Sequence, residues 1–135
     1  MLGGLEPSPE ENLNVFDTYE LAKQLVVRLR ELVPVIQRVD HDLADQLRRA
    51  ASSVVLNLAE GQRFDNGNKL RHYKIAQGSA HEVKAALDVA EAWGDLTQAT
   101  EERALLDRLL ALLWRLTSSP KLQPVRRTGA KPQAS

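Results

Sequence analysis

The sequence predicts an all-α protein, an antiparallel up-down-up-down four-helix bundle, and three observations predict it. Four segments carry apolar residues at helical spacing over several turns. Two Trp, two Tyr and two Phe stand against many Leu, Ala and Val, a balance that favours helix packing, because strands draw on β-branched and aromatic residues. Short, turn-rich joints separate the segments, so successive helices are expected to be antiparallel neighbours.

The first helix is expected to begin at Thr18 or earlier and to end or kink at Pro34, because proline disfavours the α conformation before it. A capping box of Asp17 with Glu20 favours the later start, whereas Val15 already fits the apolar face. That face is Val15, Tyr19, Ala22, Val26, Leu29 and Val33, with Leu21, Leu25 and Leu32 beside it.

The second helix has Asp40 as its predicted N-cap. Gly61 is expected to stop it in the left-handed conformation, and turn-forming residues follow over 64–68. The apolar face of this helix is Leu43, Leu47, Ala51, Val54 and Leu58.

The third helix is predicted from Lys69 to Trp93, with Gly94 as its stop. Gly78 inside it costs about 1 kcal/mol relative to Ala and suggests close approach of a neighbouring helix. The apolar face is Leu70, Tyr73, Ala76, Ala80, Val83, Leu87 and Ala90. The first and third helices carry more apolar positions than one face needs, which suggests a buried contact between subunits.

The fourth helix is predicted to be capped by Thr97 or Thr100 and to end over 118–120. Its stripe is Leu106, Leu109, Leu113 and Leu116, flanked by Leu105, Leu110 and Leu112. Trp93 and Trp114 are interpreted as core or interface anchors.

Length and composition indicate one domain. The 135 residues divide into a flexible arm (1–12), the bundle (13–119) and a disordered basic tail (120–135). The net charge is zero and there is no cysteine, so neither a strongly basic nucleic-acid domain nor a disulfide framework is indicated. No signal peptide and no apolar run near the ~20 residues of a membrane span are visible. A cytoplasmic protein without membrane contact is expected.

Catalytic and metal-binding patterns were sought and not found. A di-iron bundle needs Glu-x-x-His motifs, but the residues three before His41, His72 and His81 are Arg38, Lys69 and Gly78. The glycines at 61 and 67 lack the ending of a phosphate-binding loop. No local signature supports a nucleophile. We therefore expect no enzyme activity, no metal and no cofactor.

The remaining polar residues allow two interpretations. A basic patch could contact phosphates, or the same charges could be a solvated face with ion pairs. Asn57, Glu60 and Glu82 are interpreted as structural, with the glutamates pairing to arginines such as Arg49. The candidates for phosphate contact are Arg48, Arg49, Arg63, Lys69, Arg71, Lys74, Arg126 and Arg127.

Three ordered blocks resemble a known family. Q-L-R-R-A-A-S-S-V-V-L-N-L-A-E-G (46–61) is similar to the signature of the four-helix-bundle proteins encoded by intervening sequences within bacterial 23S rRNA genes. L-N-V-F-D-T-Y-E-L-A (13–22) and H-Y-K-I-A-Q-G-S-A-H-E-V-K (72–84) resemble two further family blocks. The chain departs at Tyr19, usually Ala, at Gln77, usually Arg, and at Lys84, usually Glu. Val55 replaces a usual Pro, which should straighten the second helix.

The resemblance implies a homopentamer of four-helix bundles around a central channel, without established enzymatic activity. The superfamily includes the accessory variability determinant of diversity-generating retroelements, a basic pentamer that partners a reverse transcriptase and binds nucleic acid. Two functions follow as expectations. One is binding of RNA or a ribonucleoprotein, with DNA also possible as the nucleic acid. The other is a scaffold for a protein partner such as a reverse transcriptase.

Overall fold

Four α-helices make up the computed structural model, which describes residues 15–64 and 66–120. They are α2 (Val15–Gln37), α3 (His41–Gly61), α4 (Asn66–Ala92) and α5 (Thr100–Ser118), and these ranges contain no strand. The predicted all-α class is confirmed. None of the described helices is both long and apolar enough to cross a membrane. The predicted arm, and the predicted tail beyond residue 120, lie outside the described residues.

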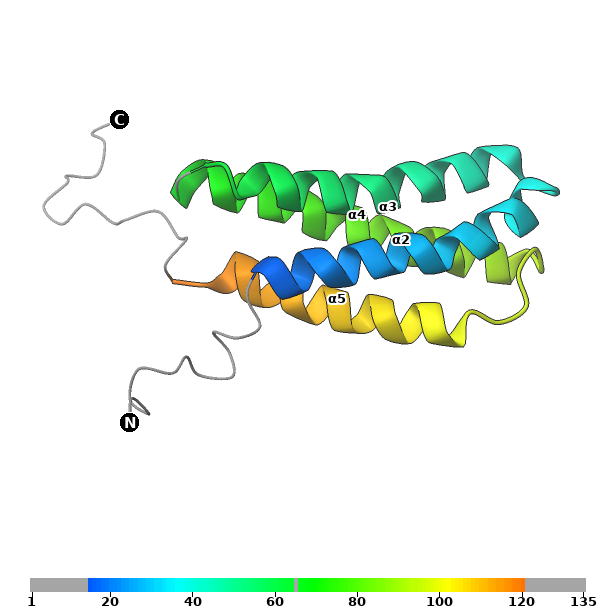
Figure 1. The fold of residues 1–135 in the computed structure, drawn as a ribbon. Coiled ribbons are helices and arrows are strands. Elements are labelled where there is room, and N and C mark those ends of the chain that lie inside the picture. Colours follow the sequence, from blue (N-terminus) through cyan, green and yellow to red (C-terminus); the bar gives the residue numbers. More distant parts are fainter. Residues whose placement is uncertain (1–14, 65, 121–135) are drawn as a thin grey trace, which may run out of the picture.

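The helices form a closed ring of neighbours, in which α2 and α4 each pack against both α3 and α5. Successive helices run in opposite directions along the bundle (Figure 1). The finish of α3 and residues 62–64 that follow it lie at the same end as the start of α2 and the finish of α5. We call this the α3–α4 end, and the opposite end, with the loop over residues 93–99, the α4–α5 end.

The buried core agrees well with the predicted stripes of α3 and α4, because every residue named for those two faces is buried. The stripe of α5 is buried at three positions, with Leu116 partly exposed. The prediction of the α2 stripe is less accurate. Leu21, Leu25 and Leu29 form its buried side, whereas Val26 is 37% exposed. The prediction for Val26 was wrong because the α2 core face is rotated toward its leucine flank.

One helix boundary follows the predicted signal and two do not. Asp40 caps α3 with a side-chain oxygen that accepts from the Leu43 amide at 3.0 Å. Pro34 lies inside α2, which continues to Gln37, and the fully buried Ile36 packs that last turn into the core. The N-cap of α5 is Ala99 without a side-chain hydrogen bond, so the predicted threonine caps were wrong.

The glycines behave differently from the predictions in two of three cases. Gly94 ends α4, as predicted, and does so in the left-handed conformation with φ of +81°. Gly61 ends α3 without positive φ. A Cβ there would lie 2.6 Å from Cε1 of Tyr73, so this glycine is required by the contact between α3 and α4. A Cβ on Gly78 meets nothing within 4 Å, so the predicted close approach at Gly78 is not found within this chain.

An ion-pair cluster holds the α4–α5 end. Arg103 on α5 donates through Nε to Oε1 of Glu91 at 2.6 Å, and its Nη2 lies 2.8 Å from Oδ1 of Asp88. Partial burial lowers the pKa of Arg103. The hydrogen bonds and charges of Glu91 and Asp88 raise it by more than burial lowers it, so that the pKa lies above its ordinary value. The arginine is therefore fixed in its charged form and joins α4 to α5.

Candidate nucleic-acid interface

A chain of polar side chains joins α3 to α4 near the α3–α4 end. Nδ2 of Asn57 donates to the carbonyl oxygen of Ser53 at 3.0 Å and to its Oγ at 3.1 Å. The Ser53 and Ser79 hydroxyl oxygens are 2.7 Å apart. On its other side, Oδ1 of Asn57 lies 3.0 Å from Nδ1 of His72. The part-buried amide is thus fully hydrogen-bonded, as expected for a structural role.

The same chain fixes the orientation of His72. Because Nδ2 of Asn57 donates to Ser53, its Oδ1 must accept, and Nδ1 of His72 must carry the proton. Nε2 is then the acceptor of the neutral ring. Neither serine contacts His72, so this arrangement is not a nucleophile with its base.

An aromatic pair adjoins the network. The Phe64 ring stacks on the His72 ring with centroids 5.4 Å apart and an interplanar angle of 6°. Phe64 is 36% exposed, so this pair is accessible at the surface of the α3–α4 end. Exposed flat rings beside cations are the usual platform for unpaired nucleobases.

Asn57 was singled out from the sequence, but its hydrogen-bond partners were not. Ser53 could have been found, because the i,i+4 spacing puts it on the same face of α3 as Asn57. Phe64, His72 and Ser79 could not, because their positions depend on the register of α4 against α3.

The structural ion pairs differ in part from the prediction. Glu60 pairs with an arginine, as expected, but with Arg63 at 3.5 Å. Arg49 instead pairs with Asp45 at 3.3 Å. Glu82 is exposed and makes no ion pair within residues 15–64 and 66–120. Arg49 was therefore the wrong partner to expect for these glutamates, because it pairs with Asp45 on its own helix.

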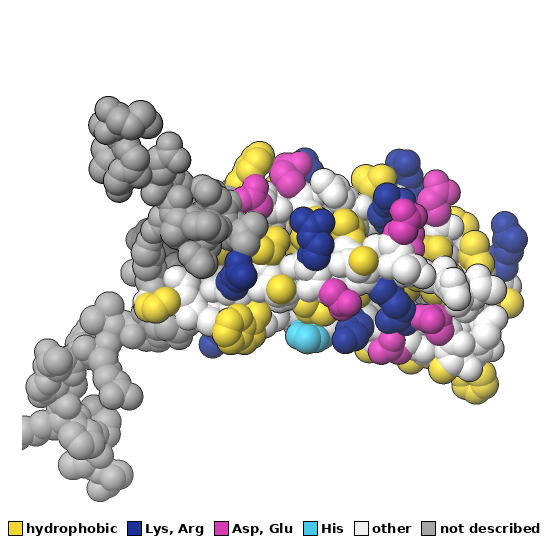
Figure 2. Space-filling view, turned by 90° about the horizontal axis from the view of Figure 1, so that it is seen from below, with side chains coloured by type: hydrophobic (Ala, Val, Ile, Leu, Met, Phe, Trp, Pro, Cys, Tyr) yellow, Lys and Arg dark blue, Asp and Glu magenta, His cyan; other side chains and the backbone are white. Residues whose placement is uncertain are grey.

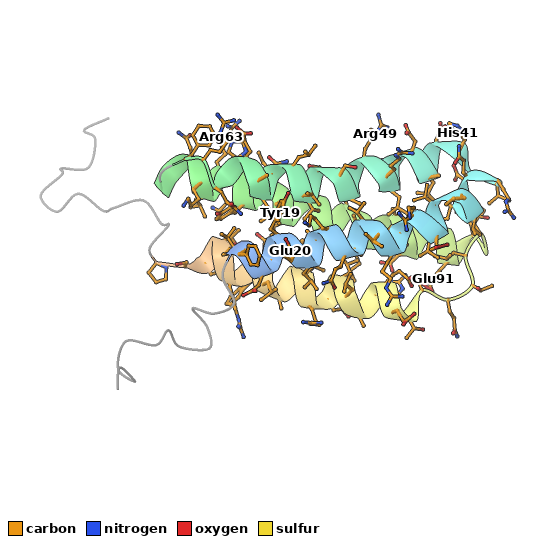
Figure 3. The ribbon with its side chains drawn as sticks, viewed as in Figure 1. Tyr19, Glu20, His41, Arg49, Arg63 and Glu91 are labelled. Carbon is orange, nitrogen blue, oxygen red and sulfur yellow. The ribbon has the colours of Figure 1, made fainter. Side chains whose placement is uncertain are left out.

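The predicted phosphate contacts separate into two groups. Arg63 lies at the α3–α4 end, whereas Arg49 lies toward the opposite end near His41 (Figure 3). Arg48 immediately precedes Arg49 on α3, so this pair does not join the first group. Arg126 and Arg127 lie outside the described residues.

The group at the α3–α4 end is the more concentrated one. Lys69, Arg71 and Lys74 occupy the first turns of α4, within about 8 Å of one another along its axis. None of these three makes an ion pair in the part of the chain that the structure describes. The pair of Arg63 with Glu60 is exposed and therefore weak. Asp65, the acid of this turn, is outside the described residues.

The remaining surface is more evenly charged. On the face that Figure 2 shows, acidic and basic side chains are interspersed with scattered apolar ones. Within the described ranges, no group of three or more His, Asp or Glu residues is placed to hold a metal ion. The α3–α4 end is therefore the best candidate for an anionic ligand.

The fold and this site define a class: an all-α four-helix bundle with a basic end that carries a stacked aromatic pair. A family model described as "23S rRNA-intervening sequence protein" matches residues 14–115. The chain belongs to this family, as the sequence blocks predicted. The family is not a known enzyme family. No match was found to a curated protein or to a solved structure.

Proposed function

We propose that this protein is a non-enzymatic homo-oligomer that binds RNA or a ribonucleoprotein through its α3–α4 end. The observation that carries the proposal is the group of Arg63, Lys69, Arg71 and Lys74 beside the stacked Phe64 and His72. Cations supply the sequence-independent attraction to phosphates, and exposed rings accept unpaired bases. The zero net charge of the chain makes this local excess the main source of attraction.

The family membership supports both parts of the proposal. The number of copies expected from the resemblance is five. The exposed Val26, Val27 and Leu56, which line a groove between α2 and α3, also favour assembly, because a partner copy would bury them.

Binding is tested by mobility shift with a synthetic RNA stem-loop at several salt concentrations. A variant with Arg63, Lys69, Arg71 and Lys74 all changed to Gln should bind more weakly. Its log–log salt slope should be smaller by about three to four, since each of the four lost phosphate contacts removes about 0.7 to 0.9 of a unit. The matched control is Arg48→Gln with Arg49→Gln, which should keep most of the affinity.

Two results would count against RNA binding. One is the absence of any mobility shift by the wild-type protein at low salt, and the other is a loss of affinity in the control pair as large as in the four-residue variant. The mass of the protein in solution tests assembly separately. A monomeric mass contradicts the homo-oligomer.

A second candidate function is a scaffold for a protein partner, such as a reverse transcriptase. Trp114 on α5 favours it, because 63% of its surface is exposed and exposed tryptophans are common at the centres of protein interfaces. Trp93 is 76% exposed, so neither tryptophan is a core anchor, and the predicted interface role stays a prediction for both. A Trp114→Ala variant that loses a co-expressed reverse transcriptase but keeps RNA binding supports the scaffold.

A further inference from the structure

Two surfaces on different sides of the bundle expose apolar side chains. The first is a groove between α2 and α3, with adjoining hollows of about 390 and 460 Å³ that share Val26, Val27 and Ser52. The second is a stripe on the outer face of α4 with heptad spacing, which consists of Ile75, Gly78, Glu82, Ala85 and Val89, all exposed. We call these the α2–α3 groove and the α4 stripe.

We propose that the α4 stripe of one copy packs into the α2–α3 groove of the next copy, in a head-to-tail contact. This inference rests on the proposed homo-oligomer and names the surfaces that form it. Such a contact joins two different faces, so repeating it by rotation can close a ring. The argument depends on three features: height along the bundle, shape and charge.

Height is fixed by the pair of Ser53 and Ser79, whose hydroxyl oxygens are 2.7 Å apart across α3 and α4. Rotation about a ring axis parallel to the bundle keeps every residue at its own height, so residues that meet across copies must share a height. From the serine pair, Leu56 lies about 4.5 Å toward the α3–α4 end, between Gly78 at about 1.5 Å and Ile75 at about 6 Å.

Shape then pairs Leu56 with Gly78. Leu56 is 66% exposed and lines the α2–α3 groove, from which it projects as a knob. Gly78 provides a gap on the α4 stripe, because a Cβ there meets nothing within 4 Å. An exposed glycine inside a long helix is costly unless something uses its space. A leucine from a neighbouring copy would occupy that gap in the way that coiled coils pack.

Opposite charges support the same contact between copies at a height nearer the α4–α5 end. Arg30 and Arg48 line the α2–α3 groove, and neither makes an ion pair among the described residues. From the same serine pair, Glu82 lies about 4.5 Å toward the α4–α5 end and Arg48 about 7.5 Å, so they are within about 3 Å in height. Packing two grooves together would instead oppose like charges. The groove is therefore complementary to the α4 stripe and not to itself.

The test uses the absence of native cysteine from the chain. A chain with both Leu56→Cys and Gly78→Cys should be cross-linked by a short bismaleimide into a ladder of covalent multimers. Either single variant should stay monomeric on a denaturing gel, because a head-to-tail contact does not bring two copies of one residue together. The matched control combines Leu56→Cys with Gly67→Cys, whose glycine is also on α4 with nothing within 4 Å of its Cβ, and should not cross-link.

A charge exchange provides the second measurement. Arg48→Glu and Glu82→Arg should each weaken assembly at least tenfold, and the double variant should restore it. Cross-linking by Leu56→Cys alone overturns the proposal, and so does an oligomer whose double-cysteine form gives no ladder. In both cases the homo-oligomer itself stands. A monomeric mass of the wild-type protein removes the oligomer and this contact together.

Discussion

The two ends of the bundle are held together by different forces. At the α3–α4 end, helices meet through close apolar contact between Gly61 and the Tyr73 ring, and the nearby cations of α4 are left without ion pairs. At the α4–α5 end, charges are used internally, because Arg103 binds both Asp88 and Glu91. A chain of zero net charge can thus offer a basic surface when its acids are paired elsewhere. The predictions below test this division, from the largest effect to the smallest.

The first prediction concerns the Gly61 contact. Gly61→Val should lower the free energy of unfolding by about 3 kcal/mol, because its Cβ would overlap the buried Tyr73 ring and neither helix can move away without opening the core. Chemical denaturation followed by circular dichroism measures the loss. Gly67→Ala is the control and should change stability by less than about 1 kcal/mol. Equal effects of the two variants would show that the contact is not what makes Gly61 necessary.

The second prediction concerns pH at the same end. Burial raises the pKa of Tyr73 from 10.0 to about 12. The folded protein therefore holds this proton more tightly than the unfolded chain, so the stabilisation is complete below pH 10 and is lost as the pH rises toward 12. Between these two pKa values the free energy of unfolding should fall by roughly 1 kcal/mol per pH unit, for a total of roughly 2 to 3 kcal/mol.

The control for this slope is Tyr73→Phe, measured at one fixed protein concentration because assembly also affects stability. The variant should lack the tyrosine contribution while the alkaline titration of lysines remains. If wild type and variant lose stability in parallel between pH 10 and 12, the burial of Tyr73 does not control the alkaline transition.

The third prediction concerns the ion pairs of Arg103 at the α4–α5 end. Arg103→Met keeps most of the side-chain volume but removes the bonds to Asp88 and Glu91, and should cost about 1 kcal/mol, since the cluster is only partly buried. Because the four cations of the α3–α4 end are far away, RNA affinity should not change. A loss of affinity as large as that of the four-residue variant would contradict the division of roles between the ends.

The sequence predicted the regular parts of this protein better than its joints. The faces of α3 and α4 were correct because burial repeats at helical spacing, and Asp40 was correct because an N-cap acts on the next turn of the same chain. The predicted threonine cap of α5 was wrong because threonine is only statistically preferred at an N-cap position. The packing of the buried Leu96 and Ala99 sets where that helix begins. α3 runs through Val55 without interruption, and the straightening expected from the absence of proline there stays a prediction.

For the candidate site, the sequence predicted individual residues but not their arrangement. The basic residues and Asn57 are visible in the sequence, but their grouping is not. Arg48 and Arg49 are neighbours in the signature block, yet lie away from the group at the α3–α4 end. Arg49 pairs with Asp45 four residues before it, a local pairing that could have been read from the sequence.

The sequence by itself determined the fold class, the family and most of the core, since each depends on residues close together in the chain. The tertiary structure decided what the polar and small residues do. Gly61 and Gly78 look alike in the sequence, but one lies against Tyr73 and the other lies open on the surface of α4. That difference depends on how the helices pack against one another, which no local pattern of residues encodes.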